Sequence, residues 1–500
     1  MRLMLLEMRP PFLRTFLPLA LIAAAAAATA ACERKSEGVV QVLVIGGEPR
    51  LVDPRTDRLD VAEAVLLGNA AQGLVRFDAR GQIEPGLAET WNVSDDGLSY
   101  IFRLANAEWP NGRKITAEQI ARMLRRRIGE SSAAALRDSF GAVEEIVAMT
   151  DRVIEIRLGQ PRPHLLQLLA HPEMGLVFEG QGSGPFAMNR AEGGEQGVRL
   201  QREVAAPDED EPEQDLLELA GATAEQAVSA FVRGEADLVL GGTFANLPFA
   251  QGASLPRRAL QFDPASGLFG LIPARKGGIL ADPEARQLLS VAIDREALIA
   301  ALAVPGLVPR ATVLEPGLDN VADAVAPAWA ATPVAERQAG LVATARRIFT
   351  EDNRKLRIAL PEGPGADILL QRLSQDWGAL GIEVERSTEG EPADLRLVDE
   401  VAPSSSASWF LRPFRCQIAP VCDEQVDQLL GGAQMTPVLD QRRALLAQAS
   451  GRIDAQQLFI PIAAPIRWSL VSPRISGFAG NRFAIHTLTG LEKVLNRTGE

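Results

Sequence analysis

The sequence predicts a mixed α/β protein of two lobes with an inserted β-rich subdomain. The chain has 500 residues and is 47% hydrophobic, which is too long for one core and favours division into subdomains. A strand, a helix and a second strand follow one another over 356–385, the order of a βαβ unit with a parallel sheet and a right-handed crossover. Short strands separated by turns crowd 74–104, which indicates a β-rich segment.

The stretch 74–128 contains the clearest local patterns. Residues 98–104 alternate between the apolar side chains of Leu98, Tyr100, Phe102 and Leu104 and a second set in which only Ile101 breaks the polar pattern, so we expect a largely half-buried strand. Thr116 and Gln119 have the spacing of a capping box, in which the hydroxyl and the amide each satisfy a backbone N–H at the start of a helix. We expect that helix to continue through Ile128.

The order of these motifs resembles that of a known family. It resembles the extracellular solute-binding proteins of family 5, the peptide- and nickel-binding periplasmic components of ABC importers. Gln119 stands where that family usually has Asp, and Gln serves equally in the cap. A second motif farther along, Ala292-Ile293-Asp294-Arg295, resembles the family's "A-I-D-R". In the first block, the matching residues are Pro85, Leu87, Ala88, Glu89, Trp91, Asp96, Gly97, Tyr100, Phe102, Leu104, Trp109, Gly112, Thr116, Ala117 and Glu118.

The resemblance implies a periplasmic-binding-protein fold, in which two hinged lobes with mixed parallel sheets enclose a solute. Lobe I would be assembled from three separate segments, because the chain leaves it twice. The predicted division is signal peptide 1–31, tether 32–38, lobe I 39–72, 182–262 and 467–500, inserted subdomain 73–181, and lobe II 263–466.

The N-terminus has the pattern of an export signal. Arg9 and Arg14 precede an apolar run over 16–31. Thr29-Ala30-Ala31-Cys32 resembles a lipobox, so we expect Cys32 to be lipidated and to anchor the protein to a membrane. Cleavage at an Ala-x-Ala site, which would release a soluble protein, is the alternative.

Three cysteines are present: Cys32, Cys416 and Cys422. If Cys32 carries lipid, an even pair remains in an oxidising compartment, which favours a Cys416–Cys422 disulfide. The bridge would stabilise its small loop by about 2 kcal/mol on the loop-entropy model. A redox or metal-binding pair is the alternative, and no histidine lies near it in the sequence.

Composition and motifs argue against several function classes. The net charge of −13 argues against nucleic acid as a partner. We find no zinc motif, P-loop, dinucleotide fingerprint or Ser/His/Asp set, so we expect no enzyme, cofactor or metal site. His164 and His171 could share a helical face, but a third ligand is missing, and we interpret both as core or surface residues.

A candidate ligand site follows the strand predicted at 394–398, because open α/β sheets bind ligands at the carboxyl ends of parallel strands. In the peptide-binding relatives that the chain resembles, the matching Asp pairs with the peptide's α-ammonium, and that role falls here on Asp399. Glu400 replaces an aromatic residue, and two carboxylates would suit a cation. Alternatively, both form a loop turn. Trp409 and Trp468 are candidate pocket aromatics, with a place in the core as the alternative.

These observations predict a monomeric substrate-binding lipoprotein in the periplasm. It would capture a small solute, by default a peptide, between its lobes and deliver it to an ABC permease in the inner membrane. The single tyrosine of the chain departs from aromatic-lined peptide clefts. A receptor for a nickel chelate or another non-peptide solute, and a degenerate binding fold serving as an envelope scaffold or chaperone, are therefore the alternatives.

Overall fold

The structure is a computed structural model that describes residues 38–53, 59–130, 140–190, 197–204, 213–387 and 390–493. The predicted signal peptide and Cys32 lie outside these ranges. Among the helices within them, none combines the length and apolar character needed to cross a bilayer.

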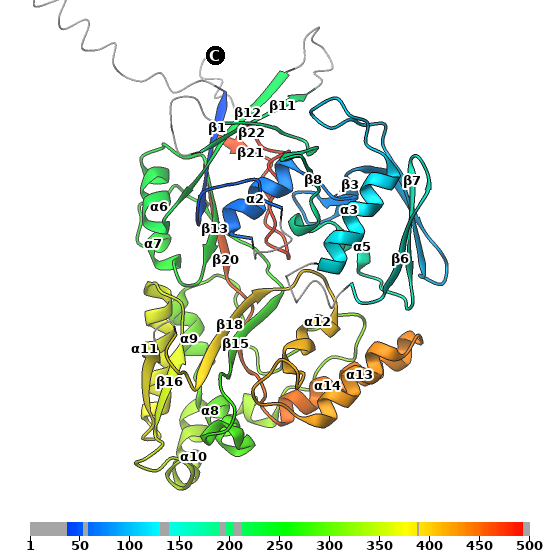
Figure 1. The fold of residues 1–500 in the computed structure, drawn as a ribbon. Coiled ribbons are helices and arrows are strands. Elements are labelled where there is room, and N and C mark those ends of the chain that lie inside the picture. The colour runs from blue at the N-terminus through cyan, green and yellow to red at the C-terminus, as the bar shows by residue number, and fades with distance from the viewer. Residues whose placement is uncertain are drawn as a thin grey trace, which may run out of the picture. The chain divides into compact units, whose positions relative to one another are not determined.

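A seven-stranded mixed sheet contains strands from distant parts of the sequence (Figure 1). Its order is β10-β11-β12-β1-β13-β20-β14. β1 and β13 are parallel, whereas the pairs β10–β11, β11–β12, β13–β20 and β14–β20 are antiparallel. The strands are β1 (Val39–Ile45), β10 (Ala187–Arg190), β11 (Val198–Val204), β12 (Glu213–Ala222), β13 (Leu238–Thr243), β14 (Leu260–Phe262) and β20 (Arg467–Val471).

Two helices associated with this sheet begin at complete capping boxes. Asp60 accepts from the backbone at the start of α2 (Val61–Ala70), while Glu63 accepts from the backbone N–H of Asp60. Thr223 and Gln226 make the same reciprocal pair at α6 (Ala224–Val232). Each box satisfies two N–H groups that a helix start otherwise leaves without partners. The short helix α7 (Leu247–Gln251) follows β13.

A five-stranded sheet has the order β17-β16-β18-β15-β19. β16, α11 and β17 form the predicted βαβ unit, and β16 and β17 are parallel. β15 is buried along its whole length because it lies between β18 and β19. The strands are β15 (Gly267–Pro273), β16 (Lys355–Ala359), β17 (Glu383–Ser387), β18 (Leu395–Val401) and β19 (Ile460–Ala463), and the helices near them are α8 (Pro283–Ala292), α9 (Arg295–Leu302), α10 (Val334–Ile348) and α11 (Pro364–Gly378).

A four-stranded antiparallel sheet, β4-β5-β7-β6, forms the predicted β-rich segment. Tyr100, Phe102 and Leu104 are buried and Ile101 is 43% exposed, so the alternation predicted for this strand is confirmed. The strands are β4 (Ala88–Val93), β5 (Ser99–Leu104), β6 (Val143–Thr150) and β7 (Val153–Leu158), accompanied by α3 (Ala117–Glu130).

The capping box predicted at α3 is only half formed. The backbone N–H of Gln119 donates to Thr116 Oγ1 at 3.3 Å. The amide oxygen of Gln119 accepts instead from Trp109 Nε1 at 2.9 Å. Trp109 is 2% exposed, and its buried indole N–H needs a partner. This demand of the core outweighs the local capping pattern.

Glycines permit a close approach where the chain returns from the four-stranded sheet. A Cβ on Gly182 would lie 2.2 Å from the carbonyl oxygen of Ala70, and one on Gly184 would lie 2.5 Å from the carbonyl carbon of Ala70. Only glycine lets this segment pack against the end of α2. Phe186 then enters the hydrophobic cluster of the seven-stranded sheet.

The seven-stranded and five-stranded sheets are connected by two short segments, 263–266 between β14 and β15 and 464–466 between β19 and β20. The carboxylate of Asp263 accepts from the backbone N–H of Asn481 at 2.9 Å and lies 3.2 Å from His486 Nε2. The first segment is thus fixed to the C-terminal part of the chain. The predicted mixed α/β fold class is confirmed, while the lobe boundaries stay predictions.

The described residues also contain three helices and a 3-10 turn after β18, and several short elements. The former are α12 (Ala407–Leu411), α13 (Glu424–Met435), α14 (Leu439–Ala455) and η5 (Arg412–Phe414). The short elements are β2 (Val75–Phe77), β3 (Ile83–Pro85), α5 (Leu165–Leu169), η2 (Pro172–Met174), β8 (Val177–Phe178), β9 (Gln181–Gly182), η3 (Ile279–Ala281), η4 (Ala328–Ala331), β21 (Ile475–Ser476) and β22 (Glu492–Lys493).

Candidate functional site

Asp399 and Glu400 lie within a strand, not in the turn after it. β18 continues to Val401, and Asp399 is opposite Phe269 while Glu400 is opposite Leu268 in β15. The sequence interpretation, which ended the strand at residue 398 and offered a loop turn as the alternative, was wrong on this boundary. β15 provides an antiparallel partner along the whole of β18, so the backbone N–H and C=O groups favour continued pairing.

The carboxylate of Asp399 already has a cationic partner. Arg467 Nη1 lies 2.8 Å from Asp399 Oδ1, and Arg467 Nη2 donates to the Asp399 backbone oxygen at 3.1 Å. The two side chains are only 17% and 16% exposed. Because Asp399 belongs to β18 and Arg467 to β20, this ion pair joins the five-stranded sheet to the seven-stranded sheet.

Burial raises the pKa of Asp399, and the charge and hydrogen bond of Arg467 oppose this effect. The neighbouring Glu400 carboxylate raises the pKa further. A low-exposure carboxylate of this kind stays ionised at neutral pH only with a compensating cation. Arg467 provides that cation, and the sequence interpretation missed it because the partner lies 68 residues farther along the chain.

Trp468, next to Arg467, is 1% exposed and packs in the hydrophobic cluster that also contains Phe244 and Phe269. Its indole N–H donates to the Thr243 carbonyl at 2.8 Å. A Cβ on Gly242 would lie 2.1 Å from the indole ring, so glycine is required there. Packing is the role that these contacts give Trp468, and its contact with a ligand stays a prediction.

A second ionic cluster lies where 263–266 enters β15. Glu315, whose side chain is 10% exposed, contacts the Ser266 hydroxyl and lies 2.6 Å from Arg310 Nη2. Arg482 Nη2 is 3.4 Å from the other oxygen of Glu315. Arg310 also donates to the Gly267 carbonyl at 3.1 Å. These contacts fix the connection between the two sheets beside the Asp399–Arg467 pair.

Trp409 lines a different feature, a cavity of about 130 Å³ between the segment that leads into α5 and the helices α12, α13 and α14. The structure therefore does not bring Trp409 together with Trp468, which belongs to another hydrophobic cluster. The cavity is lined by Arg162, Pro163, His164, Leu165, Leu168, Asp319, Ser404, Ser406, Ser408, Trp409, Arg412, Arg415, Leu430, Ala433, Gln434, Leu439, Arg442, Arg443 and Leu446.

A close His–Asp contact at this cavity joins elements that are distant in sequence. His164 Nε2 lies 2.6 Å from Asp319 Oδ1. Asp319 Oδ2 accepts from the backbone N–H of Ala407 at 2.7 Å and from the Ser406 hydroxyl at 3.2 Å. Burial alone would raise the pKa of Asp319, but these hydrogen bonds and the His164 charge lower it overall. Sequence reasoning treated His164 as a core or surface residue and gave no sign of this contact.

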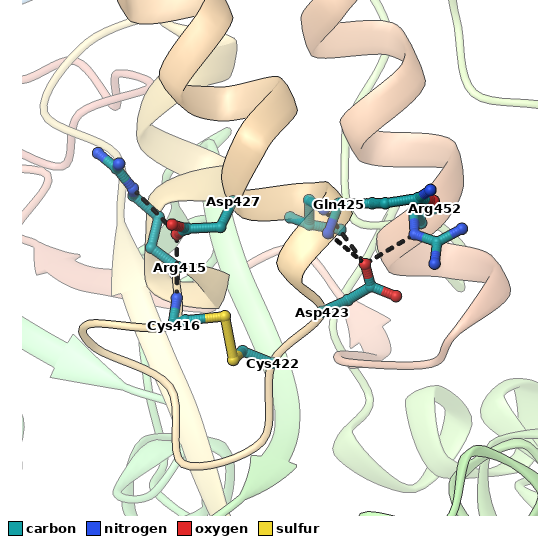
Figure 2. The surroundings of a disulfide bond; sticks show 8 residues. Arg415, Cys416, Cys422, Asp423, Gln425, Asp427 and Arg452 are labelled. Atoms are coloured by element: carbon teal, nitrogen blue, oxygen red, sulfur yellow. Dashed lines mark hydrogen bonds and ion pairs between the residues drawn. A yellow bond between two sulfur atoms is a disulfide. The ribbon is translucent and has the colours of Figure 1, made fainter.

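Cys416 and Cys422 form a disulfide that closes the loop between η5 and α13 (Figure 2). Asp427 Oδ1 accepts from the backbone N–H of Cys416 at 3.1 Å and from Arg415 Nε at 3.4 Å. Asp423 caps α13 by accepting from the Gln425 N–H at 2.8 Å. The bridge therefore lies directly beside Arg415, one of the residues that line the cavity. In the described part of the chain no group of three His, Cys, Asp or Glu residues is arranged to hold a metal ion.

Residues 82–413 match the family described as bacterial extracellular solute-binding proteins, family 5 middle. A probable di/tripeptide-binding protein 5 of Pseudomonas aeruginosa (strain UCBPP-PA14) is 25% identical over 474 residues, covering 82% of this chain and 87% of that protein. The dipeptide-binding protein DppE of Bacillus subtilis (strain 168) is 32% identical over 141 residues, covering 25% of this chain and 26% of its own.

Solved structures show the same fold. Haemophilus influenzae OppA in complex with RPPGFSPFR superposes with a TM-score of 0.77 at 17% identity, covering 91% of this chain and 99% of that one. The murein tripeptide binding protein MppA of Escherichia coli also gives 0.77 at 17% identity, covering 92% and 99%.

The chain belongs to family 5 of the bacterial extracellular solute-binding proteins, as its motifs predicted. It is therefore a non-enzymatic solute-binding component of an ABC transporter, acting outside the cytoplasm.

Proposed function

We propose that the protein captures a small peptide between its two lobes and delivers it, chemically unchanged, to an ABC permease in the inner membrane. The family match over 82–413 carries the proposal. The relative named as a probable di/tripeptide-binding protein, which this chain matches over 82% of its length, supports a short peptide as the solute.

The candidate contact region is the junction of β18 and β20, with Asp399, Glu400, Trp468 and Arg467 on its two sides. A peptide's α-ammonium would compete with Arg467 for the Asp399 carboxylate. Arg467, once released from Asp399, could pair with the peptide's own carboxylate. The Asp399–Arg467 ion pair would then be replaced by two ion pairs with the peptide, which would compensate its loss. Glu400, with its charge beside Asp399, would provide the second acceptor for the ammonium.

A receptor for a non-peptide solute is the second candidate, and the Asp399–Arg467 pair is the observation that favours it. A carboxylate that Arg467 already neutralises has less attraction for an ammonium group than a free one. The single tyrosine of the chain also leaves few residues for an aromatic cleft.

Binding by the stripped protein tests the proposal. The purified chain is unfolded in guanidinium to release bound solute, refolded, and titrated with an equimolar di- and tripeptide mixture in native mass spectrometry. We expect a 1:1 adduct with the mass of an intact peptide. Glu400→Gln, which leaves the Asp399–Arg467 pair in place, should bind at least tenfold more weakly. Failure of every peptide to bind a correctly refolded protein would reject the peptide assignment.

We further propose that Cys32 is lipidated, so that the protein, which we expect to be a monomer, is tethered to the membrane. The Thr29-Ala30-Ala31-Cys32 motif supports this, and these residues lie outside the described ranges. Globomycin, an inhibitor of the lipoprotein signal peptidase, should block cleavage of the signal peptide. The Cys32→Ser variant should no longer be found in the membrane fraction. Unaffected processing would reject the anchor.

A further inference from the structure

We propose that the cavity beneath Trp409 is a second binding site, separate from the Asp399–Arg467 junction, for a small monocarboxylate with an apolar body. The argument rests on the charge of the cavity wall, on the partners of its arginines and on its apolar surface. None of the four residues proposed to contact the solute at the β18–β20 junction lines this cavity.

The cavity wall is strongly cationic in a protein whose net charge is −13. Five arginines line it, and Asp319 is its one carboxylate among the described residues. Asp319 is already engaged by His164 at 2.6 Å and by two donors from the start of α12. An excess of positive charge around a cavity attracts an anion, because the low-dielectric wall screens the field less than water does.

Among the residues that the structure describes, two of these arginines, Arg442 and Arg162, have only neutral oxygens as hydrogen-bond acceptors. Arg442 donates to the carbonyls of Pro161 at 2.8 Å, Thr436 at 3.0 Å and Ala433 at 3.1 Å, and to the Gln160 amide at 3.2 Å. Arg162 donates to Pro161 O at 3.4 Å, and no carboxylate of the described residues forms an ion pair with it.

The electrostatics of Arg162 agree with this geometry. Burial and the neighbouring charge of Arg442 lower the pKa of Arg162 to about 10, and the charge of Asp319 offsets only part of that shift. A partly buried guanidinium next to a second guanidinium is a costly arrangement without an anion. A carboxylate held by Arg162 would remove this cost, and the planar guanidinium matches a carboxylate in geometry.

Arg443 and Arg415 are partly compensated. Arg443 pairs with Asp440 at 2.8 Å, but that carboxylate is 89% exposed, and Arg443 Nε donates to the Asp319 backbone oxygen. Arg415 lies 3.4 Å from Asp427, and the disulfide holds this segment in place (Figure 2). An ion pair with so exposed a carboxylate contributes little, so Arg443 keeps most of its positive potential at the cavity.

The rest of the wall favours an apolar body over a bare inorganic anion. Trp409, Leu165, Leu168, Leu430, Leu439 and Leu446 line the same space as the arginines. A cavity of about 130 Å³ is comparable to the roughly 150 Å³ engineered cavity that holds benzene. Benzoate therefore has the size, the apolar ring and the charge that this wall would recognise.

Isothermal titration calorimetry of the purified full chain tests the site with benzoate, benzyl alcohol and inorganic phosphate. We expect benzoate to bind at one site, and both other probes to bind at least tenfold more weakly. Arg162→Gln should lower the affinity for benzoate at least tenfold, and so should Arg443→Gln. The second variant replaces the first in the test if circular dichroism shows that Arg162→Gln folds poorly.

Arg346→Gln provides the matched control, because Arg346 is an exposed arginine of α10 outside the cavity wall. This variant should bind benzoate as the parent protein does. Absence of benzoate binding to the parent, or equal binding by folded Arg162→Gln and Arg443→Gln, would overturn the site. Equal affinity for phosphate or benzyl alcohol would overturn the assignment of an apolar carboxylate. Peptide titration of the same variants should be unchanged, so a failure here is distinguishable from a failure of the proposed peptide function.

Discussion

Replacing Arg467 by Gln removes the cation that compensates Asp399 at the junction of the two sheets. The Asp399 side chain is 16% exposed, and among the described residues it forms an ion pair with Arg467 alone, at 2.8 Å. Removing one partner of a buried pair typically costs 3–5 kcal/mol, because the other charge is left uncompensated. Since both side chains retain some exposure, we expect the lower end, about 3 kcal/mol at pH 8.

The loss should depend on pH in a defined direction. Burial already raises the pKa of Asp399, and removal of Arg467 removes the main opposing effect. The folded variant then binds a proton more tightly than the unfolded chain does. Its stability relative to the parent therefore falls as pH rises above the ordinary Asp pKa of about 4, and is restored as the pH is lowered.

Urea unfolding followed by circular dichroism at pH 8 and pH 5 measures this difference, provided that parent and variant have equal m-values. Arg233→Gln is the control, because its partner Glu235 is 52% exposed and the pair should contribute little. Asp399→Asn/Arg467→Gln should recover much of the loss. A penalty below about 0.5 kcal/mol at pH 8, or one that is the same at both pH values, would refute the account of this pair.

Three further predictions concern residues away from this junction. Burial raises the pKa of Asp454 to about 7, although the hydrogen bond from the Val313 N–H opposes this effect. Asp454→Asn should therefore raise the free energy of unfolding by up to about 4 kcal/mol at pH 8 and leave it unchanged at pH 4. A gain in the urea midpoint that is the same at both pH values would contradict this. Cys416→Ser/Cys422→Ser should lose about 2 kcal/mol relative to the oxidised parent, and an unchanged thermal midpoint would show that the bridge contributes nothing. Gln119→Ala leaves the buried Trp109 N–H without its partner, and we expect it to lower the free energy of unfolding in urea by about 1–3 kcal/mol. Glu118→Ala, on the exposed side of the same helix turn, should lower it far less. Equal losses would reject the role of this hydrogen bond.

The parts of the fold that depend on local patterns could be predicted from the sequence. The alternation of Tyr100, Phe102 and Leu104 fixed one face of β5, because side chains alternate along any strand. The βαβ unit followed from the order of its elements. The half-formed capping box at Gln119 could not be predicted, since Trp109 competes for the amide only after the core has formed.

The candidate site was harder to predict for the same reason. Asp399 was found through the resemblance, but its partner Arg467 is on another sheet, and nothing in the local sequence of either residue indicates the pairing. The boundary of β18 was misplaced because β15, which pairs with the whole of β18, precedes it by more than a hundred residues. The cavity near Trp409 likewise combines side chains from widely separated segments.

The most direct test of the central claim is the mass of whatever the protein releases after incubation with a defined peptide mixture. The refolded chain is loaded, separated from free peptide, and denatured, and the released molecules are identified by mass spectrometry. We predict one equivalent of peptide per chain, every released mass matching an intact member of the mixture even after overnight incubation. Release of cleaved or otherwise altered peptides, or of none, would contradict the account.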